Sequence, residues 1–340
     1  MEYWVERTNP TPQYSNTSSY SRSLMFAMST AGESLPLAAE LKKIFGLKLK
    51  LSELLARYTS MKVGGPADYF IELENEAALA EVLQVLDRYQ ENFWVLGNGS
   101  NVLISDGGVR GAIVRLTGEF KTIQFKQIGR MAKVTAGAAV PIGQLARLAA
   151  RRGYSGLEFA EGIPGSVGGA LYMNAGAYGS ELEQIVDQVE VMTPRGIPIF
   201  FARAEMTFGY RDSHLAAGTV VMRVRMALRK EEPAQVSAKL RELARKRKAS
   251  QPSGSPNSGS MFRNPPGDYA GRLIDAAGLK GKRVGACQIS ERHGNFIVNR
   301  GGAKAMDVRQ LMEIAKSEVQ KKFGVELIPE VKLLGDWELQ

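Results

Sequence analysis

The spacing of apolar residues changes repeatedly along this chain. From Leu51 onward, short apolar runs typical of buried strands alternate with segments in which apolar residues recur every three or four positions, as on one face of a helix. Pro141 and Gly153 flank one such segment, as helix boundaries favour. The alternation predicts an α/β architecture. The elements expected in the first half are strand 69–73, helix 76–89, strands 94–97, 102–105, 112–116 and 133–140, and helix 141–153.

The second half begins with more predicted strands, which a long helix and a stretch rich in Pro, Ser and Gly follow. Three strands are predicted between about residues 189 and 228, followed by a helix over 229–250. The Pro, Ser and Gly residues of 251–260 mark a domain boundary or a functional loop. Helix and strand are mixed after this stretch. The elements expected there are helix 269–279, strand 295–299, helix 305–324 and strand 327–335.

Residues 1–35 show no sustained periodicity. They contain eleven Ser or Thr residues, a composition typical of disorder. We therefore predict five parts along the chain. They are a disordered Ser/Thr-rich extension (1–35), two α/β subdomains (36–117 and 118–228), a basic helix with its linker (229–253) and a C-terminal α+β domain (254–340).

Composition narrows the class of protein. The 340 residues are 44% hydrophobic, enough for two or three domains with cores, yet no apolar stretch is long enough to cross a bilayer. The N-terminus also lacks the basic-then-apolar layout of a secretory signal, so we expect a cytoplasmic protein without membrane insertion. One Cys excludes an internal disulfide, and only two His argue against a metal site.

Much of the net charge of +9 lies in one segment. RKEEPAQVSAKLRELARKRKAS (229–250) holds eight Lys or Arg against three Glu. A solvated surface helix is the favoured interpretation, because a helix dipole stabilises cations in the last turn. The same charge would attract anionic cofactors or nucleotide-sugar substrates. Nucleic-acid binding is the alternative.

The stretch LGNGSNVLIS (96–105) places small polar residues between two predicted strands. Its glycines lack the Cβ atom that keeps ligands away from backbone N–H groups. The side chains of Asn98, Ser100 and Asn101 add donors, and together these groups suit a phosphate or pyrophosphate. Taken alone, an Asn-Gly pair more often marks a plain hairpin turn. Both interpretations stay open for this stretch by itself.

A second glycine-rich segment, GLEFAEGIPGSVGGALYMNAGAYGSEL (156–182), has few large apolar side chains. It is not expected to be a core element by itself, so its glycines favour approach of the backbone to a ligand. Two donor-rich loops from separate α/β units fit a pyrophosphate and differ from the single GxGxxG of a Rossmann site. Glycines that serve only turns and close packing are the alternative.

Eight motifs in a fixed order carry a resemblance to a known family. They lie between Tyr58 and Gly335 and read YTSMKVGGPADYF, LGNGSNVLISDGGVRGAIVRL, GLEFAEGIPGSVGGALYMNAGAYG, FGYRDS, GSMFRNP, GLKG, HGNFIVN and IPEV. In these motifs the chain resembles the UDP-N-acetylenolpyruvoylglucosamine reductase family of peptidoglycan precursor synthesis. The resemblance implies an α/β (α+β) fold, with a two-subdomain FAD-binding unit of the PCMH/VAO type and a C-terminal α+β substrate-binding domain.

The resemblance also implies cofactors and a reaction. FAD is bound non-covalently between the two subdomains, NADPH is the hydride donor, and UDP-N-acetylglucosamine enolpyruvate is reduced to UDP-N-acetylmuramate. The hydride reaches the vinyl carbon remote from the carboxylate, and charge develops on the neighbouring carbon as an enolate. The positions matching the family's cofactor-binding residues are Gly97, Asn98, Gly99, Ser100, Asn101, Gly162, Pro164, Gly165, Ser166, Gly168, Gly169 and Asn174.

Three residues match the family's catalytic positions. Arg211 matches the arginine placed against the enolate, Ser260 the proton donor, and Glu330 the acidic partner of that arginine. A guanidinium suits a carboxylate because it donates two hydrogen bonds, and apolar neighbours favour a raised carboxyl pKa. From the residues alone, Arg211 would more often pair with Asp212, Ser260 would be a turn residue, and Glu330 would form an edge-strand salt bridge.

The resemblance implies substrate contacts from Asn264, Lys280 and His293, with Lys280 binding the diphosphate, and a site wall that includes Tyr178 and Tyr210. A buried, hydrogen-bonded histidine is the alternative for His293. The linker between FGYRDS and GSMFRNP is short and lacks the tyrosine-bearing lid of one branch of the family. The chain therefore resembles the lidless branch, and we expect a monomer.

Two other functions stay open. Another non-covalent FAD oxidase or dehydrogenase on the same scaffold would share both loops. A covalent flavin is not expected, because residues 1–213 contain no His or Cys to hold it. A basic nucleic-acid-binding protein would instead show salt-dependent binding and no flavin colour.

Overall fold

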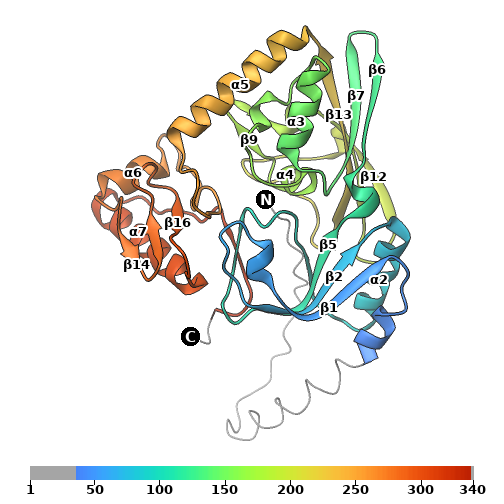
Figure 1. Ribbon diagram of the computed structural model, residues 1–340, viewed down its shortest axis with the longest axis horizontal. Helices are drawn as coiled ribbons and strands as arrows, with labels where there is room; N and C mark the ends of the chain where they lie inside the picture. The colour runs from blue at the N-terminus through green and yellow to red at the C-terminus, as the bar shows by residue number, and fades with distance from the viewer. Residues whose placement is uncertain (1–35, 338–340) are drawn as a thin grey trace, which may run out of the picture.

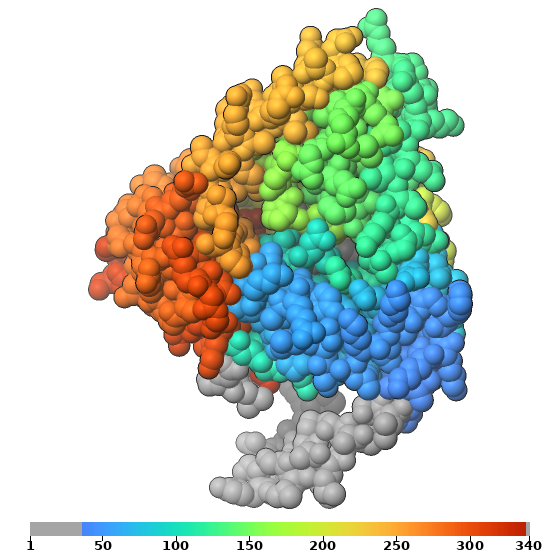
Figure 2. Space-filling model, in the orientation of Figure 1, coloured from blue at the N-terminus to red at the C-terminus, as the bar shows by residue number. Residues whose placement is uncertain are grey.

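The structure is a computed structural model that describes residues 36–337. The extension predicted over residues 1–35 lies outside the described residues. Figure 1 shows three regions, namely a blue sheet, a larger sheet in green and yellow, and an orange C-terminal part. The space-filling view in Figure 2 is hollowed where the three regions meet. No helix in the described part of the chain combines the length and apolar character needed to cross a membrane.

A four-stranded sheet forms the first region. Its strand order is β1-β2-β5-β3, with β1 antiparallel to β2 and the other neighbours parallel. Helix α2 covers one face, where it buries Leu79, Val82 and Leu86. The side chain of Asn75 caps this helix by accepting from the N–H of Ala78. The bounds are β1 Leu47–Leu54, β2 Pro66–Leu73, α2 Glu76–Arg88, β3 Phe93–Val95 and β5 Val109–Leu116, preceded by a helical segment at 36–41.

A larger antiparallel sheet forms the second region. Its order is β12-β11-β13-β7-β6, and β8 also pairs with β13. Val134 and Val224 of this sheet belong to the same hydrophobic cluster as Ile71 and Val114 of the first sheet, so the two sheets share one core. The bounds are β6 Ile123–Ile128, β7 Met131–Gly137, α3 Ile142–Arg151, β8 Tyr154–Ser155, α4 Val167–Tyr172, β11 Val186–Met192, β12 Pro198–Ala202, β13 Val220–Lys230 and α5 Pro233–Ser250.

The C-terminal region has its own hydrophobic cluster, which includes Leu273, Ile289 and Leu311. A small sheet of order β14-β15-β16 packs with two helices around it. Helix α5 runs from the second region towards this part, as Figure 1 shows. The bounds are α6 Ala270–Ala276, β14 Arg283–Val284, β15 Cys287–Ile289, β16 Ile297–Asn299 and α7 Ala305–Phe323.

One strand pair ties the C-terminal region back to the first. Strand β17 (Lys332–Leu334) lies parallel to β4 (Val102–Ile104), with Leu333 opposite Leu103. A second link comes from Asp106, whose carboxylate accepts from the N–H groups of Ala305 and Met306 at the start of α7. These contacts place the end of the described chain beside the loop that precedes β4.

Short elements complete the structure. Two-residue strands β9 and β10 pair with each other, and single-turn 3-10 helices occupy several connections. Their bounds are η1 Leu55–Tyr58, η2 Gly118–Lys121, η3 Glu158–Ala160, β9 Gly176–Ala177, β10 Ser180–Glu181, η4 Leu182–Gln184 and η5 Arg203–Glu205.

Several predictions from the apolar pattern need correction. The hairpin interpretation of residues 96–105 is wrong, because β3 pairs with β5 while β4 pairs with β17. The glycine-rich segment does contain a core element: in α4, Val167, Ala170 and Leu171 are fully buried. Small residues let this helix lie close to the larger sheet. The division at 117/118 stays a prediction, since one hydrophobic cluster extends across it.

Candidate active site

Residues 97–101 connect β3 to β4, two strands that lie in different sheets. Gly99 has φ +62°, and a Cβ atom added to it would lie 2.0 Å from the carbonyl oxygen of Tyr58. The carbonyl oxygen of Gly99 accepts from the N–H of Ser60 at 2.7 Å and from its hydroxyl at 3.0 Å. Glycine is therefore required at position 99 by the packing of this loop, independently of any ligand.

The first half of this loop borders a cavity of about 350 Å³. Gly97 and Asn98 line it from one side, and Ala139, Gln144 and Ser166 line it from the second region. Within the described structure, the backbone N–H groups of Gly97, Asn98 and Gly99 donate to no other residue. Open donors in a cleft between the two sheets fit the pyrophosphate of a dinucleotide cofactor such as FAD.

The second glycine loop differs from the first in its backbone donors. Gly162 and Gly165 have positive φ values of +70° and +136°. The N–H of Gly168 donates to Ala138, and the N–H of Gly169 donates to the Ser166 hydroxyl. The predicted convergence of N–H groups over 163–169 is thus reduced, because the donors of Gly168 and Gly169 are used inside the chain.

Two adjacent residues of the first loop, Ser100 and Asn101, contact the second glycine loop and the segment that carries Glu330. The hydroxyl of Ser100 donates to the carbonyl oxygen of Pro164 at 3.0 Å, so the two glycine loops touch. The side-chain amide of Asn101 donates to the carbonyl oxygen of Glu330 at 3.2 Å. Both side chains, predicted to face the cofactor, use these donors within the protein.

Asn174 supports the next loop of the site. Its amide nitrogen donates to Glu181 at 2.8 Å and to the carbonyl oxygen of Gly209 at 3.2 Å, and its amide oxygen accepts from the N–H of Glu183 at 3.1 Å. The residue is 1% exposed and has φ +38°. Its polar atoms are therefore engaged inside the protein rather than presented to the cavity.

Arg211 occupies the tight turn that Asn174 supports. It has φ +59°, and Gly209 and Asp212 bond to each other across the turn. One guanidinium nitrogen donates to the carbonyl oxygen of Gly176 at 3.0 Å, and Nε lies 3.1 Å from Oε1 of Glu330. The expected alternative pairing with Asp212 is wrong. Arg211 pairs with Glu330 instead, although the Nε–H is not aligned for a hydrogen bond.

The Glu330 carboxyl is shielded from water. Its side chain is 15% exposed, and burial raises its pKa, while the charges of Arg211 and Arg263 act in the opposite direction. Burial prevails because removal of a carboxylate from water is costly and the two cations only partly offset that cost. The site therefore contains a carboxyl that takes up a proton more readily than an exposed glutamate does.

Ser260 lies next to the segment that holds Glu330. It pairs with Phe296, and the following residue, Met261, accepts from the N–H of Glu330 at 2.8 Å. The half-buried Ser260 hydroxyl makes no hydrogen bond to another residue of the described chain. A hydroxyl in this position is available to a bound molecule.

Of the residues expected to contact substrate, the two tyrosines are exposed and the lysine is paired with a carboxylate. Tyr178 and Tyr210 are 46% and 47% exposed, and the Arg211 guanidinium lies 5.2 Å from the Tyr210 ring centroid. Lys280 is engaged within the C-terminal region, where its Nζ lies 2.6 Å from a carboxylate oxygen of Asp275.

The other two expected contacts are also hydrogen-bonded. The side-chain oxygen of Asn264 accepts from the N–H of Ala270, the first residue of α6. Nδ1 of His293 accepts from the N–H of Asn295 at 3.2 Å, and burial followed by the charge of Lys280 lowers the imidazole pKa. The hydrogen bond of His293 fits the alternative of a hydrogen-bonded histidine. The bond uses Nδ1 and does not involve the other ring nitrogen, Nε2.

Sequence reasoning missed three cations near the site. Arg263 lies near Glu330 and also near Lys332, whose pKa is lowered by burial and then by the charge of Arg263. Lys332 follows Glu330 by two positions, a spacing that returns to the same face of an extended segment, so this residue was detectable. The buried Nε of Arg263 makes no hydrogen bond in the described structure.

The third missed cation is Arg247 of α5. It lines a cavity of about 470 Å³ together with Gly162, Lys248 and Gln251. Burial lowers its pKa, and its side chain packs so closely that a Cβ atom on Gly162 would lie 2.8 Å from its Cδ. The interpretation of 229–250 as a solvated face is therefore incomplete, because one of its basic residues faces inward.

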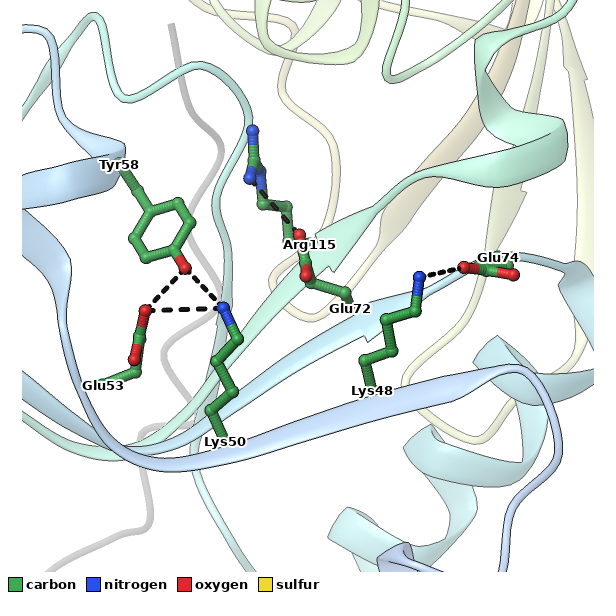
Figure 3. Close-up of polar contacts among 7 residues, drawn as sticks. All are labelled: Lys48, Lys50, Glu53, Tyr58, Glu72, Glu74 and Arg115. Atoms are coloured by element: carbon green, nitrogen blue, oxygen red, sulfur yellow. Dashed lines mark hydrogen bonds and ion pairs between the residues drawn. The ribbon is translucent and has the colours of Figure 1, made fainter.

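Polar contacts connect side chains of the first region near the cavity (Figure 3). The Tyr58 hydroxyl donates to Glu53 at 2.7 Å and accepts from Lys50 at 2.8 Å. Arg115 donates to Glu72 at 3.3 Å, and these two residues line the cavity. The contact between Arg115 and Glu72 fixes polar side chains on the wall between the first sheet and the cavity.

Comparison with known proteins agrees with this geometry. Two family models match: an FAD binding domain over residues 67–199, and the C-terminal domain of UDP-N-acetylenolpyruvoylglucosamine reductase over 251–334. UDP-N-acetylenolpyruvoylglucosamine reductase 2 of Symbiobacterium thermophilum is 44% identical over 303 residues, which is 88% of this chain and 97% of the relative. The reductase of Caldanaerobacter subterraneus is 40% identical over 290 residues, 85% of this chain and 94% of the relative.

A solved structure extends the comparison to three dimensions. The crystal structure of UDP-N-acetylenolpyruvylglucosamine reductase from Thermus caldophilus aligns with a TM-score of 0.74 at 40% identity, covering 85% of this chain and 99% of that one. The two family models cover both glycine loops, Ser260 and Glu330, whereas Arg211 lies between their matched ranges. The chain belongs to the UDP-N-acetylenolpyruvoylglucosamine reductase family.

Proposed function

We propose that this chain catalyses the NADPH-dependent reduction of UDP-N-acetylglucosamine enolpyruvate to UDP-N-acetylmuramate, a step of peptidoglycan precursor synthesis. The observation that carries the proposal is the pairing of Arg211 with the shielded carboxyl of Glu330, next to the segment that begins with Ser260. These groups come from three distant parts of the chain and meet beside the first glycine loop. We also propose that the protein acts in the cytoplasm as a monomer and binds no nucleic acid.

The proposed cofactor is FAD, held non-covalently. Gly97, Asn98 and Gly99 would bind its pyrophosphate through their open N–H groups, with Gly162 and Gly165 on the opposite loop. When bound, FAD would supply the redox chemistry, which is hydride transfer from NADPH to the vinyl carbon of the substrate. The protein's own residues bind the substrate, stabilise the developing charge and supply the proton.

Arg211 acts on the negative charge. Addition of hydride to the terminal vinyl carbon moves an electron pair onto the neighbouring carbon and its carboxylate. A guanidinium held by Gly176 and the Glu330 pair stabilises this doubly charged enolate better than it stabilises the singly charged carboxylate of the substrate. Its fixed orientation also favours two hydrogen bonds to a carboxylate, which a flexible lysine would not reproduce.

Ser260 completes the reduction by transferring its hydroxyl proton to the carbon that bears the enolate charge. Its free hydroxyl and the proximity of its segment to Glu330 support this role. The serine alkoxide left behind needs stabilisation by the neighbouring cations and recovers a proton from water before the next turnover. Glu330 keeps Arg211 oriented and, with its raised pKa, supplies a second protonatable group beside the enolate.

The remaining residues bind the two anionic substrates. Lys280 would exchange its contact with Asp275 for the diphosphate, and Asn264 and His293 would contact the same molecule. The cavity lined by Arg247 and Lys248 adds positive charge where a diphosphate also fits. Tyr178 and Tyr210, both exposed, form the wall nearest Arg211.

An anaerobic absorption experiment tests this proposal. Protein reconstituted with FAD should lose its visible band on addition of NADPH and regain it on addition of UDP-N-acetylglucosamine enolpyruvate. Bleaching without recovery would support another non-covalent FAD enzyme on the same scaffold. Failure to take up FAD, together with salt-sensitive binding of DNA or RNA, would support the nucleic-acid alternative.

A variant pair tests the role of Ser260. Ser260→Ala should bind FAD and be bleached by NADPH at the normal rate, but should scarcely recover its band with the enolpyruvyl sugar. Ser258→Ala is the matched control, because Ser258 is buried in the same loop with its hydroxyl towards Val102. Normal recovery in Ser260→Ala would remove Ser260 from the role of proton donor.

A further inference from the structure

Asn101 has two separate contacts with the segment that carries Glu330. Its side-chain amide nitrogen donates to the carbonyl oxygen of Glu330 at 3.2 Å, and its own carbonyl oxygen accepts from the N–H of Lys332 at 2.9 Å. The residue is 6% exposed. Strands β4 and β17 begin their parallel pairing just beyond this point. Asn101 therefore holds the chain immediately before and after Val331.

The opposite side of Glu330 is held by the Ser260 segment. The N–H of Glu330 donates to the carbonyl oxygen of Met261 at 2.8 Å, and Phe262 pairs with Pro329. Both polar backbone groups of Glu330 are thus fixed, one by the neighbour of Ser260 and the other by Asn101. The position of the carboxyl, 3.1 Å from Arg211, follows from this two-sided support.

The first glycine loop divides its tasks between its residues. The N–H groups of Gly97, Asn98 and Gly99 donate to no described residue, and Gly97 and Asn98 line the cavity, whereas the amide of Asn101 donates to the Glu330 backbone. An amide suits this contact because it offers a donor to a carbonyl oxygen. A carboxylate of the same shape would place two acceptors against each other.

We propose that Asn101 is a positioning residue that fixes Glu330 relative to the cofactor loop, rather than a ligand of the cofactor phosphates. The inference rests on the proposed function, and it assigns the flavin-reoxidation step as the one that depends on Asn101. Loss of the amide would free the Glu330 backbone on one side and loosen the ion pair with Arg211.

The first test reads the position of Glu330 without any turnover. In the oxidised holoenzyme labelled with ¹³C-glutamate, an NMR titration follows the Glu330 carboxyl, whose signal is assigned by its absence in Glu330→Gln. The charged groups facing this carboxyl are Arg211 and Arg263, and Arg263 also acts on Lys332. In Asn101→Ala the Glu330 pKa should fall towards its ordinary value, because a loosened side chain regains water.

The second test separates positioning from cofactor binding. Asn101→Ala should bind FAD within about twofold of the wild type and be reduced normally by NADPH, while its reoxidation by the enolpyruvyl sugar slows by about tenfold, as expected for loss of one buried hydrogen bond. The pH profile of that step should shift with the Glu330 pKa. Asn101→Asp, which keeps the size of the side chain, should be slower still.

Asn98→Ala is the matched contrast in the same loop, because Asn98 is exposed and lines the cavity. It should weaken FAD binding and leave the Glu330 titration unchanged. Weaker FAD binding in Asn101→Ala with an unchanged titration and pH profile would overturn the proposal. If wild-type enzyme is not reoxidised by the enolpyruvyl sugar, the proposed function fails, and the NMR titration still decides whether Asn101 positions Glu330.

Discussion

The two glycine-rich loops look alike in sequence and differ in what their backbones do. In residues 97–101, the N–H groups of Gly97, Asn98 and Gly99 donate to no described residue, and the close contact with Tyr58 requires a glycine at position 99. In residues 162–169, the N–H groups of Gly168 and Gly169 are used inside the chain, those of Gly162 and Gly165 donate to no described residue, and Gly162 packs against the Arg247 side chain. Glycine content alone therefore does not show which backbone donors of a loop are open to an anion.

The largest expected effect comes from Gly99→Ala. The new Cβ would lie 2.0 Å from the Tyr58 carbonyl oxygen, and the backbone would keep a left-handed φ. Because both obstacles are backbone features, we expect the free energy of unfolding to fall by about 3 kcal/mol or more. Urea unfolding measures the change. Gly97→Ala, with no positive φ, is the control and should change FAD affinity more than stability.

Asn174→Ala should have the next largest effect. It removes a side chain that makes three hydrogen bonds and supports the turn of Arg211. We expect a loss of about 2 kcal/mol of stability, together with slower reoxidation by the substrate and unchanged reduction by NADPH. Stopped-flow absorbance separates the two half-reactions. Equal slowing of both would argue against a specific link to Arg211.

Gly162→Ala sharpens the contrast with Gly99. Its Cβ would meet Cδ of Arg247, the middle of a long side chain that is able to move. The left-handed φ of +70° remains, so the expected loss of stability is about 1 kcal/mol. Unfolding of Gly99→Ala and Gly162→Ala under the same conditions gives the comparison. Equal losses of stability in the two variants would show that the left-handed φ, and not the neighbouring atoms, determines the cost of each substitution.

The smallest expected effect is a pH-dependent difference between the free energies of unfolding of Glu330→Gln and of the wild type. Its pKa is raised in the folded protein, so its contribution to stability is fully present below the unfolded-state pKa and is lost as pH rises through the folded-state pKa. Glu330→Gln removes this dependence. The free energy of unfolding of the variant relative to wild type should therefore increase as pH rises across that interval. A difference that stays constant with pH would contradict the raised pKa.

Local pattern was enough to predict much of the secondary structure. The predicted strand at 69–73 lies within β2 and the predicted helix at 76–89 matches α2, because apolar spacing and the Asn75 cap are local signals. Strands β1 and β6 have largely exposed faces and lack the apolar run that reveals a strand. The pairing of β4 with β17 joins segments from opposite ends of the chain and leaves no local signal at all.

The site was predictable only through the family resemblance. Nothing in the residues around Arg211 or Glu330 indicates that the two side chains meet, and the nearest partner in sequence, Asp212, was the wrong one. Arg247 was hidden in a helix whose basic composition indicated a solvated face. The assignment of roles to Ser260, Arg211 and Glu330 stays a prediction until the half-reactions of their variants are measured.

The return of β17 to β4 sets the order in which this enzyme becomes complete. Both glycine loops and Arg211 are synthesised before residue 230, and that part of the chain has a core of its own. Glu330 reaches Arg211 only after the C-terminal region has been made and β17 has paired with a strand made far earlier. A growing chain is therefore able to assemble its cofactor cleft before it acquires its full reactive centre.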